Sequence, residues 1–385
     1  MAVLASAYSL YLGFEFDRNV TASLTRQKTR FTPRVCVVMP CKGDEFGLDR
    51  NIAAALHQDY DNYQLAIVVD SKDDPAYAVA KSVLEKHTTP KSEILISSVS
   101  NASGKIAALM TAIEATAGQA DVYAFIDSDA FATKSWLRDL VDPLVDQTIG
   151  STTGFRWYIP SRGGFWSHVE AAWNASGTNL LFDERYNFPW GGAMALRADT
   201  LEKVGIRRIW SAAVSDDMTL NHALRAHGYR IVFLPQCMIA TFNKTSRSRF
   251  LEWATRQTAL TRVFNRGLWN YALLAYGFFD ITFLLGVVAA GLGFLFDWIW
   301  FLPATLLLSP QLLGVLRSIQ RCRTFARAMP QLSDEIASTC LPDAIASFIV
   351  PWIMTYCIIR SAHTSEIEWR GRKYTLSGMN SLATS

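Results

Sequence analysis

Two long apolar stretches near the C-terminus constrain the fold of this chain more than any other feature. Residues 271–296 contain one charged side chain, Asp280, and residues 298–316 contain none. Each stretch is close to the ~20 residues that a helix needs to cross a bilayer core of about 30 Å. Asp297 separates them and is followed by Trp298, an aromatic type that prefers the membrane interface. The pattern predicts two membrane helices joined by a short turn; a helical bundle buried in a soluble protein is the alternative.

Arginines flank the two stretches and predict their orientation. Arg262 and Arg266 precede the first stretch, and four arginines lie within residues 317–327 after the second. Cytoplasmic loops carry the excess of Lys and Arg, so both flanks are expected on the cytoplasmic side. A third apolar stretch, residues 341–359, contains two prolines. This favours a broken or in-plane segment, with a full crossing as the alternative.

The composition agrees with a chain partly embedded in a lipid bilayer. Of its 385 residues 50% are hydrophobic and 18% are charged, below the ~25% charged residues of ordinary soluble domains. The net charge of +3 gives no reason to expect a nucleic-acid partner. We expect five regions: an apolar N-terminal anchor with its linker, an α/β catalytic domain, an amphipathic interfacial helix region, membrane-embedded helices and a cytoplasmic tail. Their expected bounds are 1–32, 33–245, 246–270, 271–360 and 361–385.

The region before the apolar stretches has the pattern of an α/β fold. Four continuous apolar runs of strand length alternate with amphipathic, helix-length segments: residues 34–40, 64–70, 93–99 and 122–127. Continuous apolar runs are typical of strands that are covered on both faces. The alternation predicts a mostly parallel sheet with helices on both faces. In such sheets ligands bind at the carboxyl ends of the strands.

Acidic side chains follow two of these predicted strands. Asp70 ends the second run, and Asp127, Ser128 and Asp129 follow the fourth. A spacing of two places the carboxylates of Asp127 and Asp129 on one side of an extended chain. Mg²⁺ and Mn²⁺ are usually held by one or two carboxylates together with substrate phosphate oxygens. The pair is therefore a candidate metal site, and capping of the next helix is the alternative.

Two further groups lie later in the chain. Ser215 is a good N-cap for a helix that opens with Asp216 and Asp217, and acids in a first turn stabilise a helix. The functional interpretation is that one of the two acids is a general base at the mouth of the sheet. Arg256 lies in an arginine-rich amphipathic stretch. That stretch either lies on anionic lipid or places an arginine against a leaving diphosphate.

In this order the motifs resemble the membrane glycosyltransferases of the family 2 type, which have a GT-A fold. The resemblance is closest to the ceramide-glucosyltransferase-like branch and runs from about residue 33 to 375. The family's base-contacting aspartate matches Asp70 in VVDSKDDPA, and its metal-binding DxD matches Asp127 and Asp129. Its catalytic base, the last residue of an acidic pair before a helix, matches Asp217.

Three more segments carry the resemblance. The family's lysine between the first two motifs matches Lys105 in SGKIAALM, and its acceptor-side segment matches WGGAMALRADTL. A near-terminal string matches residues 367–374. One departure concerns the family's Q/R-x-x-R-W string, which appears here as W-x-x-R-Q and keeps Arg256. Because the outer residues differ, the departure argues against a processive polysaccharide synthase of the cellulose or hyaluronan synthase type.

The resemblance implies an inverting, metal-dependent hexosyltransferase. It would move a sugar from a UDP-sugar to a membrane lipid hydroxyl, with its catalytic domain on the cytoplasmic face of the bilayer. The alternatives are a processive polysaccharide synthase and an inactive membrane protein that binds nucleotide sugars. The implied catalytic residues are Asp217 and Arg256, and the implied ligands of Mg²⁺ or Mn²⁺ are Asp127 and Asp129. The implied donor site comprises Asp70, Lys105, Asp127, Ser128, Asp129, Asp216 and Gln257. The implied acceptor side comprises Trp190, Gly191 and Gly192.

Overall fold

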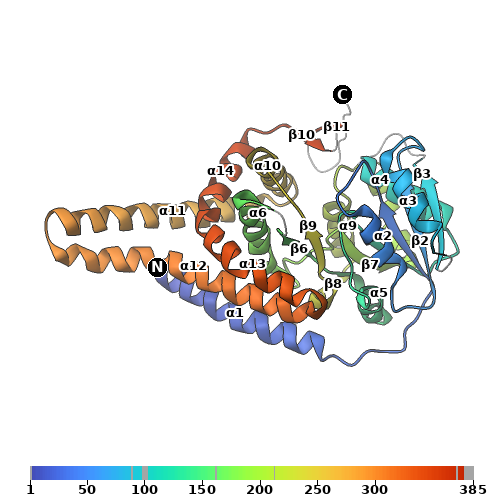
Figure 1. Cartoon of the computed structure of the whole chain (residues 1–385), viewed down its shortest axis with the longest axis horizontal. Coiled ribbons are helices and arrows are strands. Elements are labelled where there is room, and N and C mark those ends of the chain that lie inside the picture. The colour runs from blue at the N-terminus through green and yellow to red at the C-terminus, as the bar shows by residue number, and fades with distance from the viewer. Residues whose placement is uncertain are drawn as a thin grey trace. The chain divides into compact units, whose positions relative to one another are not determined.

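The computed structural model describes residues 2–87, 90–97, 103–160, 163–211, 213–369 and 372–376. The chain forms two compact units (Figure 1). The α/β unit contains residues 22–158, 178–242 and the chain from 368 onward. The helical unit contains the chain up to residue 21, together with residues 159–177 and 243–367.

The α/β unit is built on a seven-stranded sheet with the order β3-β2-β1-β4-β7-β5-β8. Its strands are β1 (Val35–Pro40), β2 (Tyr63–Val69), β3 (Lys91–Ile96), β4 (Val122–Ile126), β5 (Ile149–Thr153), β7 (Ala193–Arg197) and β8 (Arg230–Phe233). The strand pairs β1–β2, β2–β3, β1–β4 and β5–β8 are parallel, whereas β7 runs antiparallel to β4 and β5. The predicted mostly parallel α/β sheet is confirmed, and the four predicted runs form β1 to β4.

Helices cover both faces of this sheet because successive side chains of its central strands alternate between two cores. Val37 of β1 belongs to one core and Val38 to the other, and both are fully buried. The first core receives α2 (Leu48–Leu56), α3 (Pro75–Leu84) and α5 (Trp136–Val141). The second receives α4 (Gly104–Ala115), α7 (Ala198–Lys203), α8 (Ile206–Trp210) and α9 (Asp216–Ala226).

A small second sheet lies beside the DxD segment. It pairs β6 (Arg156–Ile159) with β9 (Ile239–Phe242). Phe131, just after β4, forms an antiparallel bridge with Ala240 of β9. The Thr241 hydroxyl also donates to the carbonyl of Asp129 at 3.0 Å. These contacts fix the start of β6 next to the residues that follow β4, although no periodic pattern in the sequence predicted either strand.

The helical unit collects segments that are far apart in the sequence. It contains α1 (Ala2–Leu24) through residue 21, and the later helices of the chain. These are α6 (Phe165–Ser176), α10 (Arg247–Phe264), α11 (Arg266–Leu295), α12 (Phe301–Ala328), α13 (Ser333–Ala346) and α14 (Val350–Ala362). Residues 159–177 pack within this unit, whereas they were expected in the α/β domain. The reason is a shared apolar core, in which Val169 of α6 packs with Phe250 of α10 and Val350 of α14.

The two strongest apolar stretches form a long hairpin of α11 and α12 (Figure 1). Large side chains along it are exposed, among them Leu274 (73% exposed), Phe294 (82%) and Trp298 (80%). Three helical segments in the described chain are long and apolar enough to cross a membrane: Arg266–Leu295, Trp298–Ala328 and Pro330–Ala362. Exposed apolar surface on this scale is typical of a membrane-contacting protein, so the predicted membrane association is supported.

Three details differ from the sequence expectation or refine it. The second span does not end at residue 316, because α12 continues to Ala328 and buries Arg317 and Arg321 within the helical unit. The third stretch is interrupted by a 3₁₀ turn, Ser347–Ile349, just before Pro351, whereas Pro342 lies inside α13. At the N-terminus α1 extends beyond the short apolar segment to Leu24, and Phe16 of α1 packs edge-on against Phe325 of α12.

Candidate active site

The sheet topology brings most of the predicted site residues of the α/β unit to the edge of the main sheet where its parallel strands end. Strands β1, β2 and β4 are parallel, so Asp70 and Asp127 follow strands that end at the same edge. Because β7 is antiparallel to β4 and pairs Ala193 with Ile126, Gly191 and Gly192 reach this edge from the other direction. β2 and β3 lie on one side of β1, whereas β4 lies on its other side, so the strand order reverses between β1 and β4. Such a switch in strand order is where open α/β sheets bind ligands.

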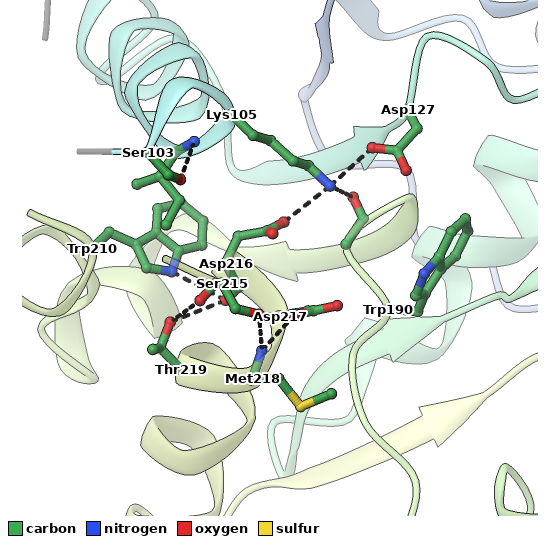
Figure 2. Close-up of polar contacts among 12 residues, drawn as sticks. Ser103, Lys105, Asp127, Trp190, Trp210, Ser215, Asp216, Asp217, Met218 and Thr219 are labelled. Atoms are coloured by element: carbon green, nitrogen blue, oxygen red, sulfur yellow. Dashed lines mark hydrogen bonds and ion pairs between the residues drawn. The ribbon is translucent and has the colours of Figure 1, made fainter. Parts of the chain in front are cut away.

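Lys105 joins three of these segments (Figure 2). Its Nζ lies 2.8 Å from Asp127 Oδ1 and 3.2 Å from Asp216 Oδ2, and it donates to the Gly191 carbonyl at 3.1 Å. Burial by itself lowers the pKa of Lys105, but Asp127 and Asp216 outweigh it, so the pKa is raised and the side chain is an ammonium ion. Lys105 therefore ties the DxD segment to the start of α9, a positioning role that the sequence did not reveal.

A second cation, Arg156, completes the charged network. Its Nη2 lies 2.8 Å from Asp127 Oδ2 and 2.8 Å from Asp129 Oδ1. The guanidinium also lies over the Trp190 ring, 5.1 Å from the ring centroid. The side chain is only 12% exposed. Arg156 was not among the predicted site residues. The signal for it in the sequence is that it is the single charged residue in the otherwise uncharged stretch 147–160.

Gly191 and Gly192 are required by space rather than by backbone conformation. A Cβ on Gly191 would overlap the carboxylate of Asp216 and lie 3.0 Å from Lys105 Nζ. A Cβ on Gly192 would overlap the Trp190 ring and lie 2.6 Å from Asp127 Oδ2. The predicted acceptor-side segment is thus packed directly against the two acids. Because the two glycines have no side chains, the carboxylates of Asp127 and Asp216 can lie this close to the backbone and to Lys105.

Asp217 has the electrostatics of a general base. Ser215 caps α9, and its hydroxyl donates to Asp217 Oδ1, which also accepts from Met218 N at 2.7 Å. Both of these hydrogen bonds end on Oδ1, and Figure 2 shows the carboxylate directed toward the side of the site where Trp190 lies. Burial and then the neighbouring Asp216 raise the pKa of Asp217 to about 6. A carboxylate whose pKa approaches neutrality is suited to accept a proton.

Comparison with known proteins shows the family of this chain. The model of glycosyl transferase family 21 matches residues 1–381, nearly the whole sequence. The chain belongs to glycosyl transferase family 21. The expected membrane glycosyltransferase of the ceramide-glucosyltransferase-like type is thereby confirmed at the level of the family. A solved structure is also similar: the mannosyltransferase PcManGT from Pyrobaculum calidifontis in complex with GDP-Man and Mn²⁺. The identity is 16% and the TM-score 0.49, over 94% of this chain and 96% of that chain.

Two further donor-site candidates of this family 21 protein, Asp70 and Ser128, lie after strands β2 and β4. Asp70 follows β2 and pairs with Lys42 at 2.8 Å. The buried Ser128 donates its hydroxyl to Glu45, and its carbonyl accepts from Asn51 at 2.8 Å. β2 and β4 are separated by β1, and two strand spacings correspond to about 10 Å between Asp70 and Asp127.

Arg256 and Gln257 belong to α10 in the helical unit. Within that unit, Trp253 packs against Trp173 with ring centroids 5.0 Å apart. The outer tryptophan of the W-x-x-R-Q string therefore has a packing role. The roles of Arg256 and Gln257 toward the donor stay predictions.

The carboxylate oxygens of Asp127 and Asp129 are suited to bind a divalent cation. One oxygen of each carboxylate contacts the same nitrogen, Arg156 Nη2, so the two oxygens already converge on a single positively charged group. The described residues contain no cluster of three or more His, Cys, Asp or Glu side chains that could hold a metal. Two carboxylates that leave the other positions to phosphate oxygens and water are typical of Mg²⁺ and Mn²⁺ in nucleotide enzymes.

Proposed function

We propose that this glycosyltransferase moves a hexose from a UDP-sugar to the hydroxyl group of a membrane lipid, with inversion at the anomeric carbon. The observation that carries the proposal is the juxtaposition at one sheet edge of the acids of the DxD segment with the acidic pair of α9. Lys105 contacts both groups, at 2.8 Å from Asp127 and 3.2 Å from Asp216. A protein that only bound nucleotide sugar would need no second acid with a raised pKa beside the first.

The donor is proposed to lie along the carboxyl edge between Asp70 and Asp127. The distance of about 10 Å between these positions suits a nucleoside diphosphate whose base lies near Asp70 and whose phosphates lie near Asp127. The N-terminus of α4, which begins at Gly104, faces the same edge and favours negative charge. Ser128, Lys105 and Asp216 would then position the carboxylates that face the diphosphate.

Asp217 is proposed as the general base of a single displacement. The acceptor hydroxyl oxygen attacks C1 of the sugar, the bond from C1 to the diphosphate oxygen breaks, and the hydroxyl proton passes to Asp217. Because attack and departure occur on opposite faces of C1, the configuration inverts. General-base assistance of this kind is typically worth about 10²–10⁴ in rate.

A Mg²⁺ or Mn²⁺ ion held by Asp127 and Asp129 would offset the charge that develops on the leaving diphosphate. Arg256 is proposed to contribute positive charge to the same group, and Gln257 to contact the donor. On the acceptor side, Trp190 with Gly191 and Gly192 is proposed to form the wall against which the acceptor lies. Trp190 is held by a hydrogen bond from its backbone N–H to Thr153 Oγ1 at 2.8 Å.

A lipid acceptor is supported by the helical unit. Its long apolar helices expose leucine, phenylalanine and tryptophan side chains, which fit a lipid environment better than water. The arginines that flank the hairpin support a cytoplasmic catalytic unit.

The test is to incubate membranes containing the protein with isotope-labelled UDP-glucose, UDP-galactose and GDP-mannose. The lipid extract and the insoluble residue are then analysed by mass spectrometry. We expect label from one UDP-sugar in a lipid product with inverted anomeric configuration, and none with the Asp217→Asn variant. Label confined to insoluble polymer would support a processive synthase instead, and binding of UDP-sugar without any product would support an inactive binding protein.

A further inference from the structure

We propose that Arg156 is an internal counter-ion that occupies the cation position between Asp127 and Asp129 in the empty enzyme. It yields that position to a divalent cation when a nucleoside diphosphate arrives, and it then pairs with the phosphate. This inference rests on the proposed donor site, but it concerns a residue that lies outside every motif that carried the resemblance.

The position of Arg156 is that of a bridging cation. One nitrogen, Nη2, lies 2.8 Å from one oxygen of Asp127 and 2.8 Å from one oxygen of Asp129, while Nη1 donates to the other oxygen of Asp129 at 2.5 Å. A metal ion shared by the two carboxylates would have to approach the same two oxygens. The guanidinium and the metal therefore compete for one place.

The surrounding contacts let the head of Arg156 move while its backbone stays in place. β6, which begins at Arg156, is paired with β9, and β9 is bridged to Phe131 beside the DxD segment. The guanidinium lies over Trp190 and Tyr158, 5.1 and 5.5 Å from the two ring centroids. These ring faces stabilise a cation without fixing its direction. The directional contacts of the head group are its hydrogen bonds to the two carboxylates and, from Nη1, to the Tyr158 hydroxyl at 3.5 Å, and a phosphate can replace the bonds to the carboxylates.

Charge balance couples the binding of the divalent cation to the binding of the nucleoside diphosphate. The carboxylate of Asp127 is shared between Lys105 on Oδ1 and Arg156 on Oδ2. A divalent cation arriving alone would leave a nearly buried guanidinium beside it without its carboxylate partners, which is unfavourable. A diphosphate removes this penalty, because a guanidinium forms strong bidentate hydrogen bonds to phosphate. Metal affinity should therefore be low without nucleotide and rise when the nucleotide binds.

The test measures Mn²⁺ binding to the purified full-length protein by electron paramagnetic resonance, with and without UDP. The variants are Arg156→Gln, which removes the charge, and Arg156→Lys, which keeps a charge but cannot bridge two carboxylates in the same way. Arg185→Gln is the matched control, because Arg185 is an exposed arginine that pairs with Asp183 away from these acids.

Without UDP, Arg156→Gln should bind Mn²⁺ about tenfold or more tightly than the parent protein, and the enhancement caused by UDP should shrink by a similar factor. Arg156→Lys should lie between the two, and Arg185→Gln should match the parent. Unchanged or weaker Mn²⁺ binding by a folded Arg156→Gln, checked by its thermal unfolding, would overturn the inference, as would an unchanged Arg156→Lys if the glutamine variant does not fold. Because no sugar or lipid is present, this result is separate from the lipid-labelling test of the transfer reaction.

Discussion

The acids of the site differ in chemistry because their contacts differ, although their sequence contexts look alike. Asp216 is 3% exposed and faces the Lys105 ammonium ion. Asp217, its neighbour, receives hydrogen bonds from the start of its own helix, and its pKa is raised by burial and by Asp216. Burial and a neighbouring carboxylate both make a carboxylate more readily protonated, and both act on Asp217. The second acid of the pair is therefore the better proton acceptor.

Replacing Asp217 by Asn should abolish transfer and stabilise the fold. The pKa of Asp217 is higher in the folded protein than in the unfolded chain, so its contribution to the free energy of unfolding is greatest below about pH 4. It is lost as the pH rises through about 6. At pH 8 the variant should therefore be more stable than the parent by about 1–3 kcal/mol, with a smaller gain at pH 5. Thermal unfolding at both pH values, with UDP binding as a control, checks this. An equal or negative difference at pH 8 would contradict it.

Alanine at Gly191 should impair the site by steric displacement. The added methyl group overlaps the Asp216 carboxylate and crowds Lys105, so we expect a loss of more than tenfold in kcat/KM and a destabilisation of about 1–3 kcal/mol. Gly164→Ala is the matched control, because a Cβ there meets nothing within 4 Å and its backbone φ is −86°. Transfer rates and melting temperatures of the two variants, measured side by side, test the expectation. Equal behaviour of both variants would refute it.

At the scale of elements, the N-terminus of α9 links helix stability to base strength. Ser215 caps the helix, and its hydroxyl also donates to Asp217. This hydrogen bond favours the carboxylate form and keeps the pKa of Asp217 from rising further. The same side chain thus supports both the helix and the chemistry that the helix carries.

Ser215→Ala should shift the pH profile of transfer. Loss of the hydroxyl raises the pKa of Asp217, so the acid limb of the kcat/KM profile, expected near pH 6 in the parent, should move to higher pH. Loss of the cap should also lower stability by about 0.5–2 kcal/mol. Ser215→Thr, which keeps a hydroxyl, is the control and should restore the profile. An acid limb that does not move in the alanine variant would argue against Asp217 as the base.

Secondary structure near the site was predictable only where a local pattern existed. The apolar runs predicted β1 to β4, and the acidic pair after Ser215 predicted the start of α9. Strands β6 and β9 have four residues each and gain their stability by pairing with each other and with the main chain beside Phe131. No sequence window contains that information, which is why Arg156 escaped notice.

At the scale of the whole molecule, the chain assembles each unit from separate segments. α6 lies between β6 and β7 in the sequence but packs with α10, α13 and α14. Asp17 of α1 likewise contacts Thr324 and Arg327 of α12, about 300 residues later. Domain boundaries drawn along the sequence cannot capture such an arrangement, because they assume that neighbours in the chain share a core.

The proposed orientation predicts which side of the membrane carries the turn between α11 and α12. A cysteine replacing the exposed Asp297 should react with a membrane-impermeant maleimide that is added outside intact cells or sealed right-side-out vesicles. A cysteine replacing the exposed Lys86 of the α/β unit should react only after permeabilisation. The parent protein gives the background, since five of its six cysteines are buried and Cys340 is partly buried. Labelling of the two positions from the same side would contradict the proposed topology.

The local features were predictable from the sequence alone: four strands and their helices, the Asp127 and Asp129 pair, the cap of α9 and the apolar stretches. Each depends on residues within a few positions of one another, so periodicity and composition suffice to predict it. Long-range contacts, in contrast, place Lys105 between Asp127 and Asp216, Arg156 between Asp127 and Asp129, and α6 in the helical unit. These features depend on contacts between residues tens to hundreds of positions apart, and the energies of burial and charge pairing act only after folding has brought those residues together.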